Sequence, residues 1–289
     1  MAGASAAFGA DLVVQAPDID TAALKTLARI AGATEIVALT RAETQAFRLS
    51  GDARRDAVAA FCLEAGLDFA FVPRDRRLDR VRLVAFDMDS TLITIECIDE
   101  IADMHDGIRP KVAAVTASAM RGEIDFRASL QQRVALLRAL PVAALERVYA
   151  ERLALSPGAE RMLAGFRRIG AQTLLVSGGF TFFTDRLKDR LGIDHTAAST
   201  LEIVDGRLTG RITGEIVDGA VKARAFARLR AGLSGDGGIA VAIGDGANDL
   251  PMLRHADVSV GYRAKPVVRV EATHAIDHCG LDAVLNLFA

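Results

Sequence analysis

The chain has 289 residues, of which 51% are hydrophobic and 25% charged, so it can bury a substantial core and is not intrinsically disordered over most of its length. Its 35 Lys and Arg residues nearly balance 37 Asp and Glu residues, for a net charge of -2. This balance and the 5% of aromatic residues speak against nucleic acid or an acidic membrane as partner, and favour a protein that acts on small molecules.

The cysteines and the N-terminus predict a cytoplasmic protein. Cys62, Cys97 and Cys279 are odd in number and far apart, so we expect reduced cysteines rather than a disulfide framework or a zinc site. No basic residue precedes Lys25, so the apolar N-terminus lacks the basic region of a secretory signal. Uncharged apolar runs of about 18 residues do not occur, so no transmembrane helix is expected.

The first 77 residues predict a small α/β domain. Apolar runs at 11–16, 35–40, 46–50 and 68–73 indicate strands, and helix-period stretches at 20–32 and 52–66 indicate helices. The order β, α, β, β, α, β is that of a ferredoxin-like sandwich. The segment RDRRLDR that follows alternates in charge, which favours a solvated linker over a nucleic-acid patch. We therefore place the domain boundary between residues 77 and 78.

Residues 78–289 predict a doubly wound α/β domain. The runs VRLVAF, AQTLLVS and IAVAIG are apolar along their whole length, as expected for a parallel sheet covered by helices on both faces. A long helical insertion, at about residues 99–150, separates the first two of these strands. Because it leaves the sheet just after a strand end, it is placed to form a cap over a site there.

Polar residues directly follow the predicted strands, where ligands bind in open parallel sheets. Asp87 and Asp89 follow the first strand, Ser177 ends the second, and Asp245 follows the third. Three carboxylates so close would repel one another unless a hard cation lay among them, and oxygen ligands suit Mg²⁺. Ser177 and Lys222 supply the hydrogen-bond donor and the positive charge that a phosphate group needs.

A site of this kind could simply bind phosphate, but it also contains the parts for covalent catalysis. The carboxylate of Asp87 can attack phosphorus to form an aspartyl-phosphate. Asp89 can then protonate the leaving alkoxide and later accept a proton from the water that cleaves the intermediate. The sequence therefore favours phosphoryl transfer assisted by Mg²⁺.

These segments resemble the four motifs of haloacid dehalogenase-like (HAD) phosphotransferases: FDMDSTL, SGG, an isolated lysine and GDGANDLPML. The resemblance extends from Arg82 to the C-terminus. It implies a HAD-like fold and the following roles: Asp87 as nucleophile, Asp89 as acid and base, Ser177, Gly178 and Lys222 at the phosphate, Asp87, Asp245 and the backbone carbonyl of Asp89 on Mg²⁺, and Asn248 and Asp249 in support.

Within that superfamily, DMDSTLITIECIDEIA, the helical insertion and SGGFTFF resemble the phosphoserine phosphatase family. This resemblance implies hydrolysis of O-phospho-L-serine to L-serine and phosphate, with Glu96 at the ammonium group and Arg133 at the carboxylate. It also places Met120 and Phe126 in the apolar wall of the cap. Without the resemblance, Glu96 could be an ordinary acid at a helix start, Arg133 a surface arginine, and Met120 a core residue.

Several alternatives stay open at this point. The core would also serve a HAD phosphatase or phosphotransferase for another small phosphomonoester, and a catalytically silent amino-acid sensor is a further candidate. By element order alone, the N-terminal unit is similar to ACT domains, which implies regulation or a homodimer. Because every candidate catalytic residue follows the linker, a chain starting near Leu78 is expected to fold and keep the chemistry.

Overall fold

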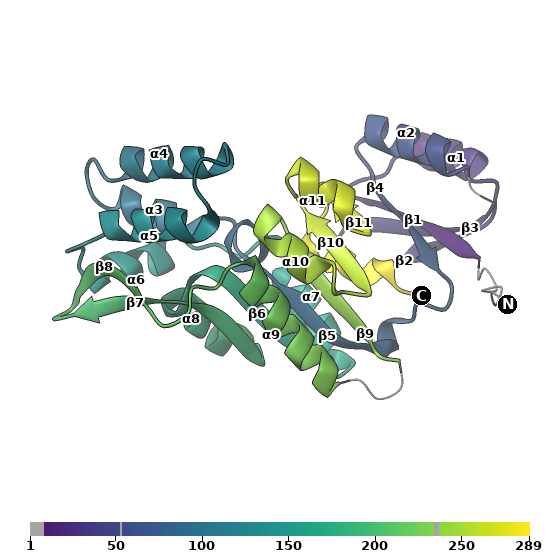
Figure 1. Ribbon diagram of the computed structural model, residues 1–289. Coiled ribbons are helices and arrows are strands. Elements are labelled where there is room, and N and C mark those ends of the chain that lie inside the picture. The colour runs from purple at the N-terminus through teal and green to yellow at the C-terminus, as the bar shows by residue number, and fades with distance from the viewer. Residues whose placement is uncertain (1–8, 53, 234–236) are drawn as a thin grey trace, which may run out of the picture.

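A computed structural model describes residues 9–52, 54–233 and 237–289 (Figure 1). Residues 1–8 lie outside this range, and part of the argument against a secretory signal rests on them. Ala53, in the second predicted helix, also lies outside it. No helix of the described residues combines the length and the apolar character needed to cross a membrane. Cys62, Cys97 and Cys279 are unpaired and buried, as expected.

The N-terminal unit has the predicted ferredoxin-like order. Its elements are β1 (Ala10–Ala16), α1 (Thr21–Ile30), β2 (Ala33–Leu39), β3 (Gln45–Gly51), α2 (Arg55–Ala65) and β4 (Asp68–Pro73). The strands form an antiparallel sheet in the order β2-β3-β1-β4. One face packs on the two helices, where Leu12 and Val14 meet Leu27 and Cys62.

The other face of this small sheet packs against the rest of the protein. Strand side chains alternate between faces, so Val13 points away from α1 and α2. With Ala70 and Val72 it lies in one hydrophobic cluster with Leu281 and Phe288 near the C-terminus. The N-terminal unit therefore has a core of its own on one face only, and shares the other with the larger domain. Its independence as a folding domain, 1–77 against 78–289, stays a prediction.

The second sheet has seven strands in the order β11-β10-β9-β5-β6-β7-β8. They are β5 (Val81–Phe86), β6 (Gln172–Phe180), β7 (His195–Val204), β8 (Arg207–Thr213), β9 (Ile239–Gly244), β10 (Val258–Tyr262) and β11 (His274–Ile276). All neighbouring pairs are parallel except the β7-β8 hairpin. The three strands recognised in the sequence, β5, β6 and β9, lie at its centre, which confirms the doubly wound α/β class.

Helices cover both faces of this sheet. Leu83 and Ala85 of β5 pack with α9 (Gly219–Gly232), α10 (Leu250–Leu253) and α11 (Pro266–Glu271). Val84 and Phe86 face the opposite way, toward α7 (Ala159–Arg168) and α8 (Thr181–Leu191). The alternation along β5 thus builds two apolar layers from one continuous apolar run. Short helical turns complete the domain at Leu78–Arg80, Ala247–Asp249 and Leu281–Leu287.

The helical insertion forms a cap beside the sheet (Figure 1). It contains α3 (Cys97–Asp103), α4 (Arg109–Met120), α5 (Phe126–Leu136) and α6 (Val142–Arg147), followed by a turn at Val148–Arg152. The cap limits of about 99–150 stay a prediction. The β7-β8 hairpin extends from the sheet to the cap, where the Ala139 N–H donates to the Leu208 carbonyl (2.8 Å) and the Val142 N–H to the Gly206 carbonyl (2.9 Å).

Candidate active site

The turn after β5 places the first two candidate carboxylates. Asp87 and Asp89 both have extended backbone angles, and between them and Thr91 the chain turns at Ser90, which has a left-handed φ of 55°. The Ile93 N–H closes the turn on the Met88 carbonyl at 3.0 Å. Both carboxylates line the same cavity, as the two-residue spacing predicts.

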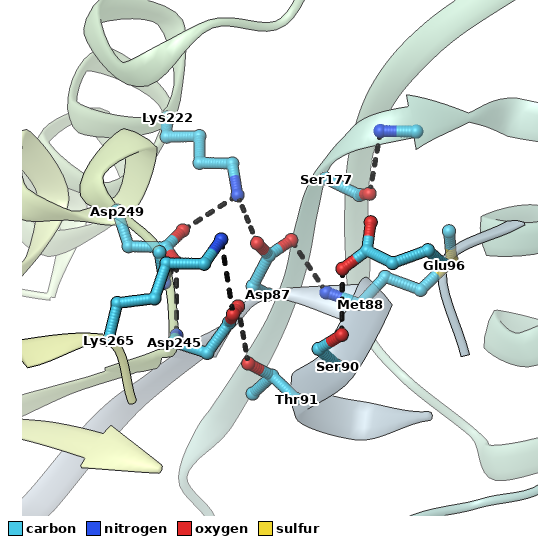
Figure 2. Close-up of polar contacts among 12 residues, drawn as sticks. Asp87, Met88, Ser90, Thr91, Glu96, Ser177, Lys222, Asp245, Asp249 and Lys265 are labelled. Carbon is cyan, nitrogen blue, oxygen red and sulfur yellow. Dashed lines mark hydrogen bonds and ion pairs between the residues drawn. The ribbon is translucent and has the colours of Figure 1, made fainter. Parts of the chain in front are cut away.

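Lys222 links two of the motifs through ion pairs (Figure 2). Its Nζ lies 2.7 Å from Oδ2 of Asp87 and 2.7 Å from Oδ1 of Asp249. The lysine side chain is fully buried, where an unpaired ammonium would be costly. Burial lowers the pKa of Lys222, but the negative charges of Asp249 and Asp87 raise it by more than burial lowers it. The pKa of Lys222 therefore lies above its usual value. The lysine is therefore a fixed positive charge behind Asp87.

Three buried carboxylates form a group suited to a metal ion. Asp87, Asp245 and Asp249 each offer an oxygen, and these oxygens lie within 4.8 Å of one another. Burial and the neighbouring Asp249 raise the pKa of Asp87, although Lys222 opposes them. Burial, and next Asp249, raise the pKa of Asp245 to about 6. The group carries more negative charge than one lysine balances, so its donor set fits a hard divalent cation.

Asp249 is held more tightly than the other two carboxylates. Its Oδ1 accepts from Lys222, and its Oδ2 accepts the N–H groups of Asp245 (3.2 Å) and Gly246 (3.0 Å). A Cβ on Gly244 would lie 2.5 Å from Oδ2 of Asp249, so a glycine is needed there. Both oxygens are thus occupied, which fits the supporting role expected for Asp249.

Asp89 lies on the cap side of Asp87. Its Oδ1 accepts the N–H of Cys97 at 3.1 Å, at the start of α3. Burial, and next Glu96, raise the pKa of Asp89 to about 7. A carboxyl group with this pKa is partly protonated near neutral pH and can give up or accept a proton. Its side chain is outside the three-carboxylate group, and the binding of metal by its backbone carbonyl stays a prediction.

The SGG segment at the end of β6 brings backbone close to Asp89 and to the cap. The hydroxyl of Ser177 accepts the N–H of Gly179 at 2.8 Å, which leaves its hydrogen for another partner. A Cβ on Gly179 would lie 2.8 Å from Oδ2 of Asp89, and one on Gly178 would lie 2.7 Å from the ring of Phe126. Glycines are therefore required for the core and the cap to approach here.

A cavity of about 410 Å³ lies between the carboxyl edge of the sheet and the cap. The candidate residues that line it are Asp87, Asp89, Glu96, Met120, Phe126, Arg133, Ser177, Gly178, Asp245 and Asn248. Lys222 and Asp249 lie behind this wall. Four segments far apart in the sequence, the cap included, thus meet around one space, and Lys222 lies behind them.

The cap residues have different surroundings. Glu96 accepts the hydroxyl of Ser90 at 2.7 Å. Arg133 is half-buried, and its Nε donates to the Ser129 carbonyl at 3.4 Å. Burial lowers the pKa of Arg133, opposed mainly by Asp99 and then Glu96. Met120 lines the cavity but is 76% exposed, so it is a wall residue rather than part of the core.

Sequence reasoning missed Asp99, Thr91 and Lys265. Asp99 lines the cavity beside Arg133. The Thr91 hydroxyl lies 3.5 Å from Oδ1 of Asp245, and Lys265 Nζ lies 4.0 Å from Oδ2 of Asp245 (Figure 2). The signal for Lys265 was its place in GYRAKP, directly after an apolar run. That run is β10, a parallel strand whose carboxyl end lies at the same edge as the other motifs.

The profile of the haloacid dehalogenase-like hydrolases matches residues 84–254, and the chain belongs to this family. Its relatives include the phosphoserine phosphatase of Polaromonas sp. (strain JS666), which is 50% identical over 230 residues, or 78% of this chain and 97% of the relative. A probable phosphoserine phosphatase from Vibrio cholerae has a similar crystal structure, with a TM-score of 0.83, 34% identity, and coverage of 96% of this chain and 86% of the other.

Two further matches concern the chemistry and the N-terminal unit. A structure of a phospho-aspartyl intermediate analogue of phosphoserine phosphatase matches with a TM-score of 0.66 and 33% identity, over 72% of this chain and 99% of the other. Residues 12–58 match a domain of unknown function, DUF4072. The likeness of the N-terminal unit to ACT domains therefore stays a prediction.

Proposed function

We propose that the protein is a magnesium-dependent phosphatase that hydrolyses O-phospho-L-serine to L-serine and phosphate, the last step of serine biosynthesis. One observation carries this proposal: a cavity that has Asp87 and Asp89 on its core side and Glu96 and Arg133 on its cap side. The first pair supplies phosphoryl chemistry, and the second is complementary to an ammonium and a carboxylate group. The relatives named phosphoserine phosphatase support the same substrate.

In the proposed reaction, a carboxylate oxygen of Asp87 attacks phosphorus, and the bond from phosphorus to the serine oxygen breaks. Asp89 gives its proton to the leaving serine alkoxide. Asp89 then takes a proton from water, which attacks phosphorus and breaks its bond to Asp87. Phosphate leaves, and both carboxyl groups return to their starting state. Lys222 fixes the orientation of Asp87 throughout, because it is paired at 2.7 Å and buried.

Mg²⁺ would be held by Asp87, Asp245 and the backbone carbonyl of Asp89. When bound, it offsets the negative charge of the carboxylates and of the transferring phosphoryl group. The fit rests on three buried carboxylates within 4.8 Å, two of which have a raised pKa. Contacts of Ser177, Gly178 and Asn248 with the phosphate are part of this proposal, as is the attraction of the phosphate by the ammonium of Lys222 behind Asp87.

Phosphate release from O-phospho-L-serine and from a panel of other phosphomonoesters tests the proposal. We expect phosphoserine to be preferred, Mg²⁺ to be required, and Ca²⁺ to inhibit, because Ca²⁺ prefers larger oxygen shells that would engage both oxygens of Asp87. Turnover in the presence of chelator would contradict the metal dependence. Preference for a phosphomonoester without an amino-acid group would contradict the substrate.

Two cap variants separate recognition from chemistry. Glu96→Gln and Arg133→Ala should each lower kcat/KM for phosphoserine by about one to two powers of ten, because each loses a charge-assisted hydrogen bond. Hydrolysis of p-nitrophenyl phosphate, which has neither ammonium nor carboxylate, is the matched control and should change much less. Equal losses on both substrates would show that these residues serve the cap in general.

The cellular location and the oligomeric state belong to the same proposal. A cytoplasmic location is supported by three unpaired, buried cysteines. A homodimer through the N-terminal unit is supported by β2, an edge strand on which Ile36 and Val37 are 46% and 44% exposed. The molecular mass in solution of the protein and of its Ile36→Lys variant tests this contact.

A further inference from the structure

A second cavity, of about 570 Å³, adjoins the catalytic one between the cap and the core. We call it the outer cavity. The two cavities share Thr116, Met120, Phe126, Arg133, Asn248 and Lys265 as walls. The outer cavity is otherwise bounded by Ala119, Ile124, Ser129, Gly219, Ala247 and Pro251. A molecule in one cavity is therefore adjacent to the other.

The two cavities differ in charge. Asp87, Asp89, Glu96, Asp99 and Asp245 all line the catalytic cavity. The charged residues that line the outer cavity, among those the structure describes, are Arg133 and Lys265. Apart from these two cations its walls are uncharged, so it is complementary to an anion, whereas a dianion in the catalytic cavity faces carboxylates on several sides.

A buried hydroxyl in the outer wall has no partner. Ser129 of α5 is 2% exposed, and its Oγ makes no hydrogen bond with any described residue. The hydroxyl oxygen itself is shielded from the open space of the cavity, so Ser129 contributes there through its backbone carbonyl and not as a hydrogen-bond donor. Ser129 lies one turn before Arg133, and its carbonyl accepts Nε of that arginine.

Lys265 is the cation at the junction. Its backbone N–H donates to the Asp245 carbonyl at 2.9 Å, which fixes the loop between β10 and α11 beside the catalytic carboxylates. Its side chain is 57% exposed, and the ammonium lies 4.0 Å from Asp245. At this distance the ammonium is held loosely compared with Lys222, which has two partners at 2.7 Å. Lys265 can therefore reorient toward an incoming anion.

We propose that the outer cavity is an anion-binding antechamber, in which Lys265 receives the phosphate group of the substrate before it enters the catalytic cavity. This inference rests on the proposed function. Lys265 offers one positive charge, and Arg133, whose Nε donates to the Ser129 carbonyl, offers a second cation shared with the catalytic cavity. The same chemistry suits inorganic phosphate as it leaves, so the antechamber serves the substrate and the product in turn.

Steady-state kinetics of the Lys265→Gln variant test the proposal. We expect kcat/KM for O-phospho-L-serine to fall about tenfold, mainly through a higher KM, because the residue acts on capture rather than on the chemical step. The dependence of kcat/KM on ionic strength should become shallower, and Lys265→Arg should restore both. Lys111→Gln, an equal charge change on the exposed surface of α4, is the control and should leave the kinetics unchanged.

Inhibition by inorganic phosphate shows whether the antechamber binds the product as well as the phosphate group of the substrate. If the antechamber also holds the product, Lys265→Gln should raise the inhibition constant of inorganic phosphate along with KM. If it serves the substrate alone, KM rises and that constant does not. A loss confined to kcat, or a salt dependence equal to that of Lys111→Gln, would overturn the proposal.

All variants are also measured with p-nitrophenyl phosphate. If phosphoserine proves not to be a substrate, the proposed function fails, while the comparison of variants still tests Lys265.

Discussion

Two buried aspartates at different edges of the molecule have opposite roles. At the carboxyl edge of the large sheet, Asp87 pairs with Lys222 and faces a cavity. At the β11 edge, where the N-terminal unit docks, Asp68 of β4 is 4% exposed and accepts the backbone N–H groups of Asp277, His278 and Cys279 at 2.8 to 3.3 Å.

The two aspartates differ in how much of each carboxylate their hydrogen-bond partners leave free. The N–H groups that follow β11 occupy both oxygens of Asp68. Its carboxylate therefore serves to join the N-terminal unit to the larger domain. Asp87 has one strong cationic partner and the N–H of Met88 at 2.7 Å, and its carboxylate still borders open space. An aspartate at a strand end is therefore a candidate for chemistry when its partners leave it a face toward a cavity.

The largest expected effect that separates the two sites is that of Asp87→Asn. An amide cannot supply the attacking carboxylate oxygen, so turnover should fall by at least about a thousandfold. Phosphate release measures this loss, and trapping of the phosphoenzyme should fail as well. Thermal unfolding should stay cooperative, because Lys222 keeps Asp249 as a partner. Normal turnover by this variant would refute the role of Asp87.

Asp68→Asn should do the reverse. It replaces an acceptor oxygen by a donor that faces backbone N–H groups, so the free energy of unfolding should fall by about 1 to 3 kcal/mol. Denaturant unfolding measures the change, while kcat/KM should be retained because Asp68 is outside both cavities. Asp56→Asn, on the exposed side of α2, is the control. An unchanged free energy of unfolding would show that the hydrogen bonds of Asp68 make no net contribution to stability.

The last expected effect concerns pH and lies at the same junction between the N-terminal unit and the larger domain. His274 of β11 is buried, with Nε2 3.1 Å from Arg76 and Nδ1 2.8 Å from the Thr273 hydroxyl. Burial, and next Arg76, lower the pKa of His274 from 6.5 to about 4. The unfolded chain therefore takes up a proton at a higher pH than the folded protein does.

The free energy of unfolding should consequently fall as the pH drops from about 6.5 to 4, and His274 should account for up to about 3 kcal/mol of this loss. Below pH 4 the histidine should cause no further loss. Above pH 6.5 the histidine is neutral in both states and has no effect. Urea unfolding over this range measures the slope. His274→Gln, which keeps an acceptor for Arg76, should flatten it; an equal slope in the variant would assign the acid sensitivity to other groups.

The sequence predicted the candidate active site better than the junction between the N-terminal unit and the larger domain. Continuous apolar runs identify β5, β6 and β9, and the polar residues that follow them are forced to one edge by the parallel sheet. β10 and β11 have only five and three residues, and without them Lys265 could not be placed at that edge. The hydrogen bonds of Asp68 with residues 277–279 join segments about two hundred positions apart, which no local pattern indicates.

The same limit applies to the N-terminal unit. Its element order follows from local periodicity, but whether its second face is solvated or packed is decided by tertiary contacts of Val13, Ala70 and Val72. A chain starting near Leu78 would uncover the surface that these residues protect around Phe288. Such a truncated chain keeps every candidate catalytic residue, but it should be less stable than the full chain.

The β7-β8 hairpin has a consequence for how the cap can move. The cap is tied to the sheet at both ends of its own chain and also, through the backbone of Ala139, Leu140 and Val142, to the hairpin at residues 206–208. A cap that swung freely would have to break this third attachment, so opening proceeds most easily as a joint bending of the cap and hairpin. β7 pairs directly with β6, the strand that ends at Ser177 and the glycines. Backbone hydrogen bonds thus connect the end of β6 with residues 139–142 of the cap through β7 and the hairpin, so a displacement of the cap is coupled to this edge of the sheet.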